Sequence, residues 1–147
     1  MWTKIFCVIV ALSNVAAILP IKYAHVNNKH VDFIALLVTA LASVASHLAP
    51  AFFPHLNSEL LWVDRVASIA AVLHFAAQFF LVCPYDFERA YTSMSVVVGI
   101  GLVSLFTAEV LFRGSYSFFW CFFHCVWHGC AFLSARKMQY FIYRVQK

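Results

Sequence analysis

The chain has 147 residues, of which 64% are hydrophobic and 11% are charged, and its mean hydropathy is +0.85. Soluble domains carry about 25% charged residues, so this composition excludes a soluble globular domain and predicts an integral membrane protein. The net charge of +4 is small and falls mostly in loops and the tail, where it indicates topology and not nucleic-acid binding. We expect one transmembrane domain over residues 1–147.

Five segments are long and apolar enough to cross a membrane, which takes about 20 residues for a helix. They cover residues 2–23, 31–53, 60–83, 91–112 and 117–136. We therefore predict an all-α bundle of five spans, in which short connections make neighbouring spans antiparallel. Only Ser95 and Gly99, four residues apart on the fourth span, suggest a close contact between helices through small residues.

Lysine and arginine residues divide unevenly between the two ends of these spans. One end holds Lys4, Arg65 and Arg113, whereas the other holds Lys22, Lys29, Arg89, Arg136, Lys137, Arg144 and Lys147. Because basic loops remain in the cytosol, we expect a cytosolic C-terminus and an N-terminus that lies outside the cell or in a lumen.

Five polar residues interrupt the apolar spans. Ser43 and His47 lie four residues apart on the second span, and so do His124 and His128 on the fifth, so each pair shares one helix face. Asp64 begins the third span. Antiparallel packing brings all five to a similar depth in the membrane half that holds the N-terminus. Because polar groups at that depth are costly and usually functional, the pattern predicts a single buried site.

Three imidazoles with one open position are typical of a catalytic zinc centre. We therefore predict zinc bound by His47, His124 and His128. Asp64 would act as general base or orient a water molecule, and Ser43 would hold that water or stabilise an oxyanion. A site of this kind, reached through the membrane, favours the ester or amide bond of a membrane lipid as substrate.

The same residues are compatible with other functions. Cys121 and Cys125 lie on the helix stripe of His124 and His128 and could compete as metal ligands. The chain could instead be non-catalytic, as a fusion factor or as a small subunit of a homo-oligomer or larger membrane complex. A third alternative is a heme-binding electron carrier with paired histidines as axial ligands, His74 included. Outside that role, we expect His74 to be hydrogen-bonded inside the bundle or to be part of a deeper polar pocket.

The five polar residues resemble the signature of the CREST superfamily of multi-span membrane hydrolases and receptors. This superfamily includes alkaline ceramidases, adiponectin and progestin receptors, and a branch with a GPI-processing phospholipase and the fusion protein myomaker. It is marked by one serine, one aspartate and three histidines, which here would be Ser43, Asp64, His47, His124 and His128.

The similarity is greatest to the last of these branches. It rests on LSNVAAILP at residues 12–20, Asp32, Ser46-His47, VDRVAS at residues 63–68, and HCVWHGCAF at residues 124–132. The resemblance implies zinc held by the three histidines, with the aspartate and serine beside its water. It also implies an external N-terminus and a cytosolic C-terminus. Members of the superfamily have seven spans, so the fourth and fifth family spans are expected to be missing here.

Overall fold

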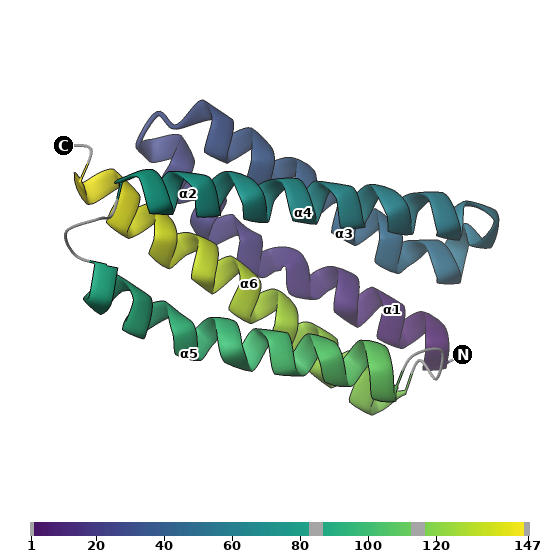
Figure 1. Cartoon of the computed structure of the whole chain (residues 1–147). Helices are drawn as coiled ribbons and strands as arrows, with labels where there is room; N and C mark the ends of the chain where they lie inside the picture. Colours follow the sequence, from purple (N-terminus) through teal and green to yellow (C-terminus); the bar gives the residue numbers. More distant parts are fainter. Residues whose placement is uncertain (1, 83–86, 113–116, 146–147) are drawn as a thin grey trace.

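The computed structural model describes residues 2–82, 87–112 and 117–145, which are helical almost throughout (Figure 1). The helices are α1 (Trp2–Ser13), η1 (Asn14–Ala17), α2 (Ile18–Val26), α3 (His30–Phe52), η2 (Pro54–Leu56), α4 (Asn57–Val82), α5 (Phe87–Phe106), η3 (Thr107–Leu111) and α6 (Phe118–Val145). These residues contain no strand, so the predicted all-α class is confirmed.

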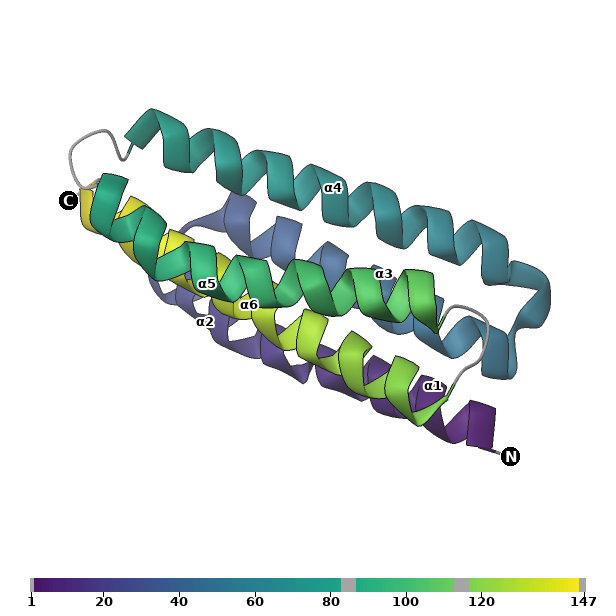
Figure 2. The ribbon, with the colours of Figure 1, turned by 60° about the horizontal axis from the view of Figure 1, so that its bottom comes forward.

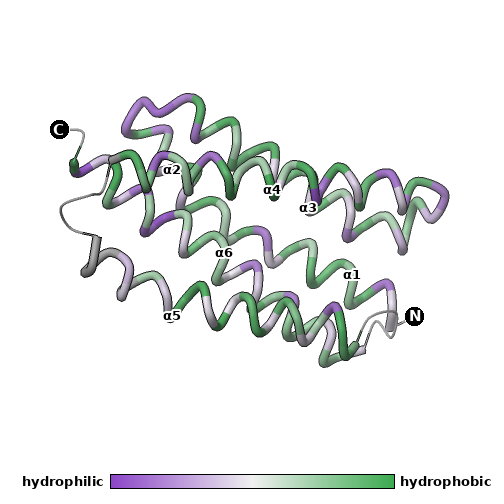
Figure 3. Tube along the Cα trace, in the orientation of Figure 1, coloured by the Kyte–Doolittle hydropathy of each residue, from purple (hydrophilic) through white to green (hydrophobic). Residues whose placement is uncertain are grey.

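Five stretches of helix are long and apolar enough to cross a membrane. They are Trp2–Val26, His30–Phe52, Pro54–Leu81, Met94–Leu111 and Phe118–Val145. Large apolar side chains such as Leu12, Ile69 and Phe80 are exposed on their outer faces. Figure 3 shows hydrophobic residues along most of each helix, with hydrophilic residues around the α2–α3 and α3–α4 connections and at isolated points within the spans. The chain is an integral membrane protein that crosses the bilayer several times.

The sequence predicts the fifth span over residues 117–136 and allows an amphipathic tail through Arg136, Lys137 and Arg144. The helix does continue along this tail, to Val145. The Arg136 and Lys137 side chains are half-buried, and the Arg136 guanidinium lies 3.3 Å from the centre of the Tyr23 ring. Long basic side chains can bury their stems along apolar surface, so they do not end the helix. The limit predicted for the third span, residue 83, lies outside the described residues.

Helix α6 packs against four others, namely α1, α2, α4 and α5, while α3 packs against α1, α2 and α4. Two buried clusters fill the space between them. Phe132 and Ile142 of α6 belong to one, with Leu36 of α3. Val10 of α1 and Trp120 of α6 belong to the other. The polar site described below lies beside this second cluster.

Helices α4 and α5 follow one another in the chain but do not lie side by side (Figure 2). Among the described residues, no Cα atom of α4 comes within 8 Å of one in α5. This is unusual, because consecutive elements are most often adjacent in space. The span formed by α4 is also the least buried. Only 6% of its most apolar stretch is buried inside the bundle, against 22–39% in the other four spans.

The close helix contact predicted at Ser95 and Gly99 is wrong. A Cβ atom added at Gly99 would meet nothing within 4 Å, and the Ser95 hydroxyl donates to the Thr92 carbonyl of its own helix at 3.1 Å. The close approach lies instead at Gly101, where an added Cβ would be 2.9 Å from Cys130 Cβ. Residue spacing along α5 does not tell which of its faces meets α6.

Candidate metal centre

Three buried histidines meet between α3 and α6. His47 comes from α3, and His124 and His128 lie one turn apart on α6. One ring nitrogen of each can be chosen so that all three lie within 4.8 Å of one another. The ring centroids are 4.6 Å apart for His47–His124 and 5.1 Å for each pair with His128. The predicted convergence of these three imidazoles is confirmed, and their role as ligands stays a prediction.

The unpaired atoms of this group fit a metal ion. His47 Nε2 and His124 Nδ1 are buried and have no hydrogen-bond partner among the described residues. A buried nitrogen of this kind costs about 1–3 kcal/mol unless something satisfies it. Zinc bound at about 2.0–2.1 Å in a tetrahedron needs nitrogens roughly 3.4 Å apart. Nitrogens already within 4.8 Å of one another can reach that spacing by small movements of the side chains.

His128 is oriented by hydroxyl groups on both sides of its ring. Ser13 Oγ lies 2.7 Å from Nδ1, and Ser43 Oγ lies 3.3 Å from Nε2. The Ser13 hydroxyl has one proton, which it donates to the Val10 carbonyl at 2.6 Å. If this proton stays directed at that carbonyl, the Ser13 hydroxyl accepts from His128 Nδ1. In this tautomer the lone pair of Nε2 is free to bind a metal.

Ser13 and its neighbour Asn14 come from the junction of α1 and η1, and neither was expected at the site. Asn14 Nδ2 lies 3.4 Å from His128 Nδ1, and the Asn14 side chain is buried. Both residues belong to the stretch LSNVAAILP, which was singled out from the sequence without a predicted role for either of them. Spacing could not reveal them, because they lie 115 and 114 residues from His128.

Asp64 lies at the edge of the histidine group and is linked to it through a serine. Its Oδ2 accepts a hydrogen bond from Ser46 Oγ at 3.2 Å, and its Oδ1 accepts one from Ser68 Oγ at 3.5 Å. The Ser46 hydroxyl also lies 3.0 Å from the Ser43 carbonyl. Within the described structure, Asp64 makes no hydrogen bond to the histidines. Its predicted role toward a metal-bound water molecule stays a prediction.

Glu109 is a second carboxylate at the site, and the sequence reading missed it. It lies in η3, a π-helical turn, a form that often occurs at functional sites. Its Oε1 is 3.5 Å from His124 Nδ1, and the two atoms do not form a hydrogen bond. The signal for Glu109 was present, because an acidic residue inside an apolar span is rare and usually functional.

Two of the alternative readings find less support in this geometry. In the described part of the chain, the metal-ligand group holds three histidines and no cysteine, and Cys121 Sγ lies 3.9 Å from the Phe6 carbonyl on α1. His74 is bonded to Asp32 and is not part of the group. The three rings pack against one another too closely for a porphyrin to fit between any two of them.

The centre thus joins three imidazoles and a serine hydroxyl, with two carboxylates at its edge. No protein-family model, curated protein or solved structure matches this chain. The function of the centre is therefore argued from its own residues, namely their burial, their unpaired nitrogens and their place inside a membrane bundle.

Proposed function

We propose that this chain is a zinc-dependent membrane hydrolase of the CREST type, which cleaves an ester or amide bond in a membrane lipid. The observation that carries this proposal is the group of three buried histidines, two of which have an unpaired nitrogen. A metal ion would satisfy those nitrogens. Because the site lies among apolar membrane-spanning helices, lipids would have readier access to it than polar solutes.

Each polar residue has a role in this proposal that follows from its position. A bound zinc ion would polarise a carbonyl group and activate a water molecule. Asp64, held by Ser46 and Ser68, would accept the proton of that water. The Ser43 hydroxyl, beside His128 Nε2, would donate a hydrogen bond to the oxygen on which negative charge develops.

The arrangement of α4 and α5 supports the family proposal. If the fourth and fifth family spans are missing, α4 corresponds to the third family span and α5 to the sixth. Two helices that were once separated by others need not pack together, and α4 and α5 do not approach each other. The carboxylates of Asp64 on α4 and Glu109 on η3 lie on the two sides of this separation.

The proposal is tested by the metal content and lipid hydrolysis of the purified full chain in detergent. We expect one zinc equivalent at the histidine group, which His47→Ala and His124→Ala remove together with fatty-acid release from ceramide or phospholipid micelles. His55→Ala is the matched control, because His55 is exposed on η2. The proposal fails if the wild type has no zinc that depends on His124, or if His124→Ala hydrolyses lipid at the wild-type rate.

A non-catalytic role as a subunit of a larger membrane complex is the second candidate. The observation in its favour is the exposure of α4, whose span is only 6% buried within the chain. A partner helix could cover this surface as well as lipid does. Zinc binding without hydrolysis of any lipid, together with a stable oligomer in detergent, would favour this role over catalysis.

A further inference from the structure

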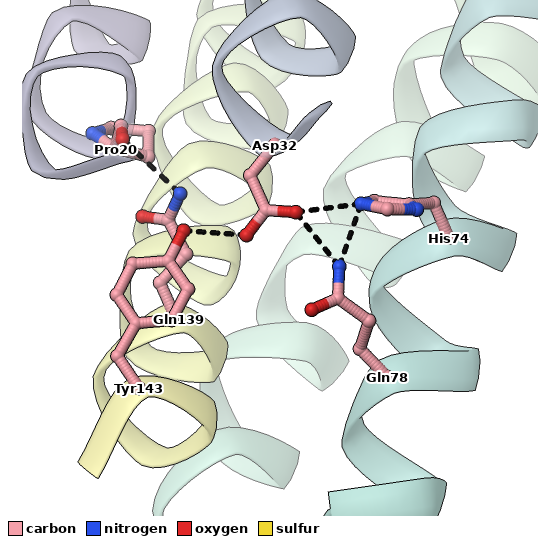
Figure 4. Close-up of polar contacts among 6 residues, drawn as sticks. All are labelled: Pro20, Asp32, His74, Gln78, Gln139 and Tyr143. Carbon is pink, nitrogen blue, oxygen red and sulfur yellow. Dashed lines mark hydrogen bonds and ion pairs between the residues drawn. The ribbon is translucent and has the colours of Figure 1, made fainter. Parts of the chain in front are cut away.

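A second polar cluster lies inside the bundle, well away from the histidine group (Figure 4). Its centre is Asp32 in the first turn of α3, with only 3% of its surface exposed. His47 is about 22 Å further along the same helix, at about 1.5 Å per residue. His74 and Gln78 of α4 and Tyr143 of α6 converge on Asp32, so three helices build the cluster.

Three polar atoms of this cluster form a small triangle. Asp32 Oδ1 lies 2.7 Å from His74 Nε2 and 2.8 Å from Gln78 Nε2. The third side, between His74 Nε2 and Gln78 Nε2, is 2.6 Å. The other carboxylate oxygen, Oδ2, accepts a hydrogen bond from the Tyr143 hydroxyl at 2.5 Å.

Hydrogen bonds alone cannot satisfy all three sides of the triangle. The imidazole Nε2 carries at most one proton, and the carboxylate has none when ionised. The two protons of the Gln78 amide point about 120° apart, whereas its two partners are separated by roughly 60°, because the three sides are nearly equal. At least one side therefore brings together two lone pairs or two N–H groups.

We propose that Asp32, His74 and Gln78 form a binding site for a small divalent cation, independent of the three-histidine centre. A half-turn of the Gln78 amide places Oε1 where Nε2 lies, so the ligands become a carboxylate oxygen, an imidazole nitrogen and an amide oxygen. Ligands at right angles about 2.1 Å from a small cation are about 3 Å apart. The observed 2.6–2.8 Å is close to that spacing. This mixed oxygen and nitrogen set suits manganese or zinc.

The surroundings of the triangle fit such a site. The Tyr143 hydroxyl fixes the carboxylate through Oδ2 and leaves Oδ1 directed at α4, as outer hydrogen bonds do for metal-binding carboxylates. A cation would compensate the buried charge of Asp32, which is otherwise costly inside a membrane. The His74 side chain is 28% exposed, so the site can be reached from outside the bundle.

The test is a titration of the purified full chain with Mn²⁺ and Zn²⁺, with bound metal counted per chain. Asp32→Asn and His74→Asn should each lose one equivalent that the His47→Ala/His124→Ala variant retains. Tyr143→Phe should keep this equivalent but bind it about 10–100-fold more weakly, because it removes only the outer hydrogen bond. His30→Ala, an exposed histidine at the start of α3, should bind metal as the wild type does.

Retention of the other equivalent shows that each variant is folded, and Tyr143→Phe remains informative if Asp32→Asn does not fold. The proposal is overturned if the wild type binds no metal beyond what His47→Ala/His124→Ala removes, or if Asp32→Asn and His74→Asn keep every equivalent. Either result leaves the three-histidine centre untouched. If only the His47→Ala/His124→Ala variant loses a metal equivalent, the result supports the three-histidine centre and overturns the site at Asp32.

Discussion

His128 differs from the other two histidines of the centre because both of its ring nitrogens have polar neighbours. Ser13 Oγ lies 2.7 Å from Nδ1 on one side, and Ser43 Oγ lies 3.3 Å from Nε2 on the other. His47 Nε2 and His124 Nδ1 have no such partner among the described residues. His128 is therefore oriented before a metal binds, whereas the other two can adjust to it.

Removal of the Ser13 hydroxyl should weaken metal binding. Ser13→Ala leaves His128 Nδ1 without its acceptor, and loss of such an outer contact lowers metal affinity about 10–100-fold. Competition with a chromogenic zinc chelator measures the change. Ser95→Ala is the control, because its hydroxyl bonds only its own helix and is exposed. Equal zinc affinity in Ser13→Ala and wild type would contradict a proton on His128 Nδ1.

Asp64 should matter for catalysis and not for metal binding. Asp64→Asn keeps the shape of the side chain but removes the base, so hydrolysis should fall about 10²–10⁴-fold while zinc content stays at the wild-type value. Parallel measurements of both quantities on one preparation separate the two effects. Glu59→Gln, an exposed acid in the first turn of α4, should change neither. Loss of zinc in Asp64→Asn would make Asp64 a ligand.

The sequence predicted His47, His124 and His128 although they lie on two different helices, and it missed Ser13, Asn14 and Glu109. His124 and His128 are four apart, so helix geometry alone puts them together. Ser13 lies at the junction of α1 and η1, and Glu109 lies in a π-helical turn. Departures from regular α-helix of this kind leave no simple periodic pattern in a sequence.

At the scale of elements, α4 is attached to α3 by polar contacts at three levels. Ser46 bonds Asp64 near one end, and Thr39 Oγ1 donates to the Ala67 carbonyl at 3.3 Å in the middle. Asp32 bonds His74 toward the other end, which confirms that His74 is hydrogen-bonded inside the bundle. Apolar burial differs little between lipid and protein, so these contacts help to set the register of α4.

Gly101 should tolerate a side chain less well than Gly99. Alanine favours helix over glycine by roughly 1 kcal/mol, but at Gly101 its Cβ would lie 2.9 Å from Cys130 Cβ. Overpacking of that kind costs about 1–3 kcal/mol. Gly101→Ala should thus lower the unfolding temperature in detergent, and Gly99→Ala should leave it equal or higher. The same change in both variants would argue against close packing of α5 on α6.

At the scale of the whole molecule, the two ends of the bundle differ in charge. The basic residues counted at the C-terminal end include Lys22, Lys29, Arg136, Lys137 and Arg144, whereas Lys4 and Arg65 belong to the other end. Arg113, Lys147 and the side chain of Arg89 fall outside the described part of the chain. The predicted orientation thus still rests on the charge count.

A C-terminal reporter should confirm that orientation. If basic residues remain in the cytosol, a fluorescent protein at the C-terminus should be active there, and a glycosylation tag at the N-terminus should be modified. Exchange of Arg136, Lys137 and Arg144 for glutamine should reduce the proportion of correctly oriented chains. Glycosylation at the C-terminus of the wild type would reverse the assignment.

The common depth of His47, His124 and His128 was predictable because short connections force antiparallel spans, and depth then follows from residue number. Which spans are neighbours was not predictable. Nothing in the residues of α4 and α5 indicates that two consecutive helices would fail to meet, since both are apolar around most of their circumference. In a membrane, an apolar helix face can pack against either protein or lipid, so its residues do not show which of the two it contacts.

The direction in which the Glu109 side chain points depends on the number of residues in the π-helical turn of η3 as well as on their identity. A π turn holds one residue more than an α turn, and each residue of an α-helix turns the chain by about 100°. Loss of Thr107 or Ala108 from this turn could restore an unbroken α-helix and rotate Glu109 away from His124 without altering either side chain. A single-codon deletion could thus dismantle this part of the centre while every residue facing the metal position stays in the gene.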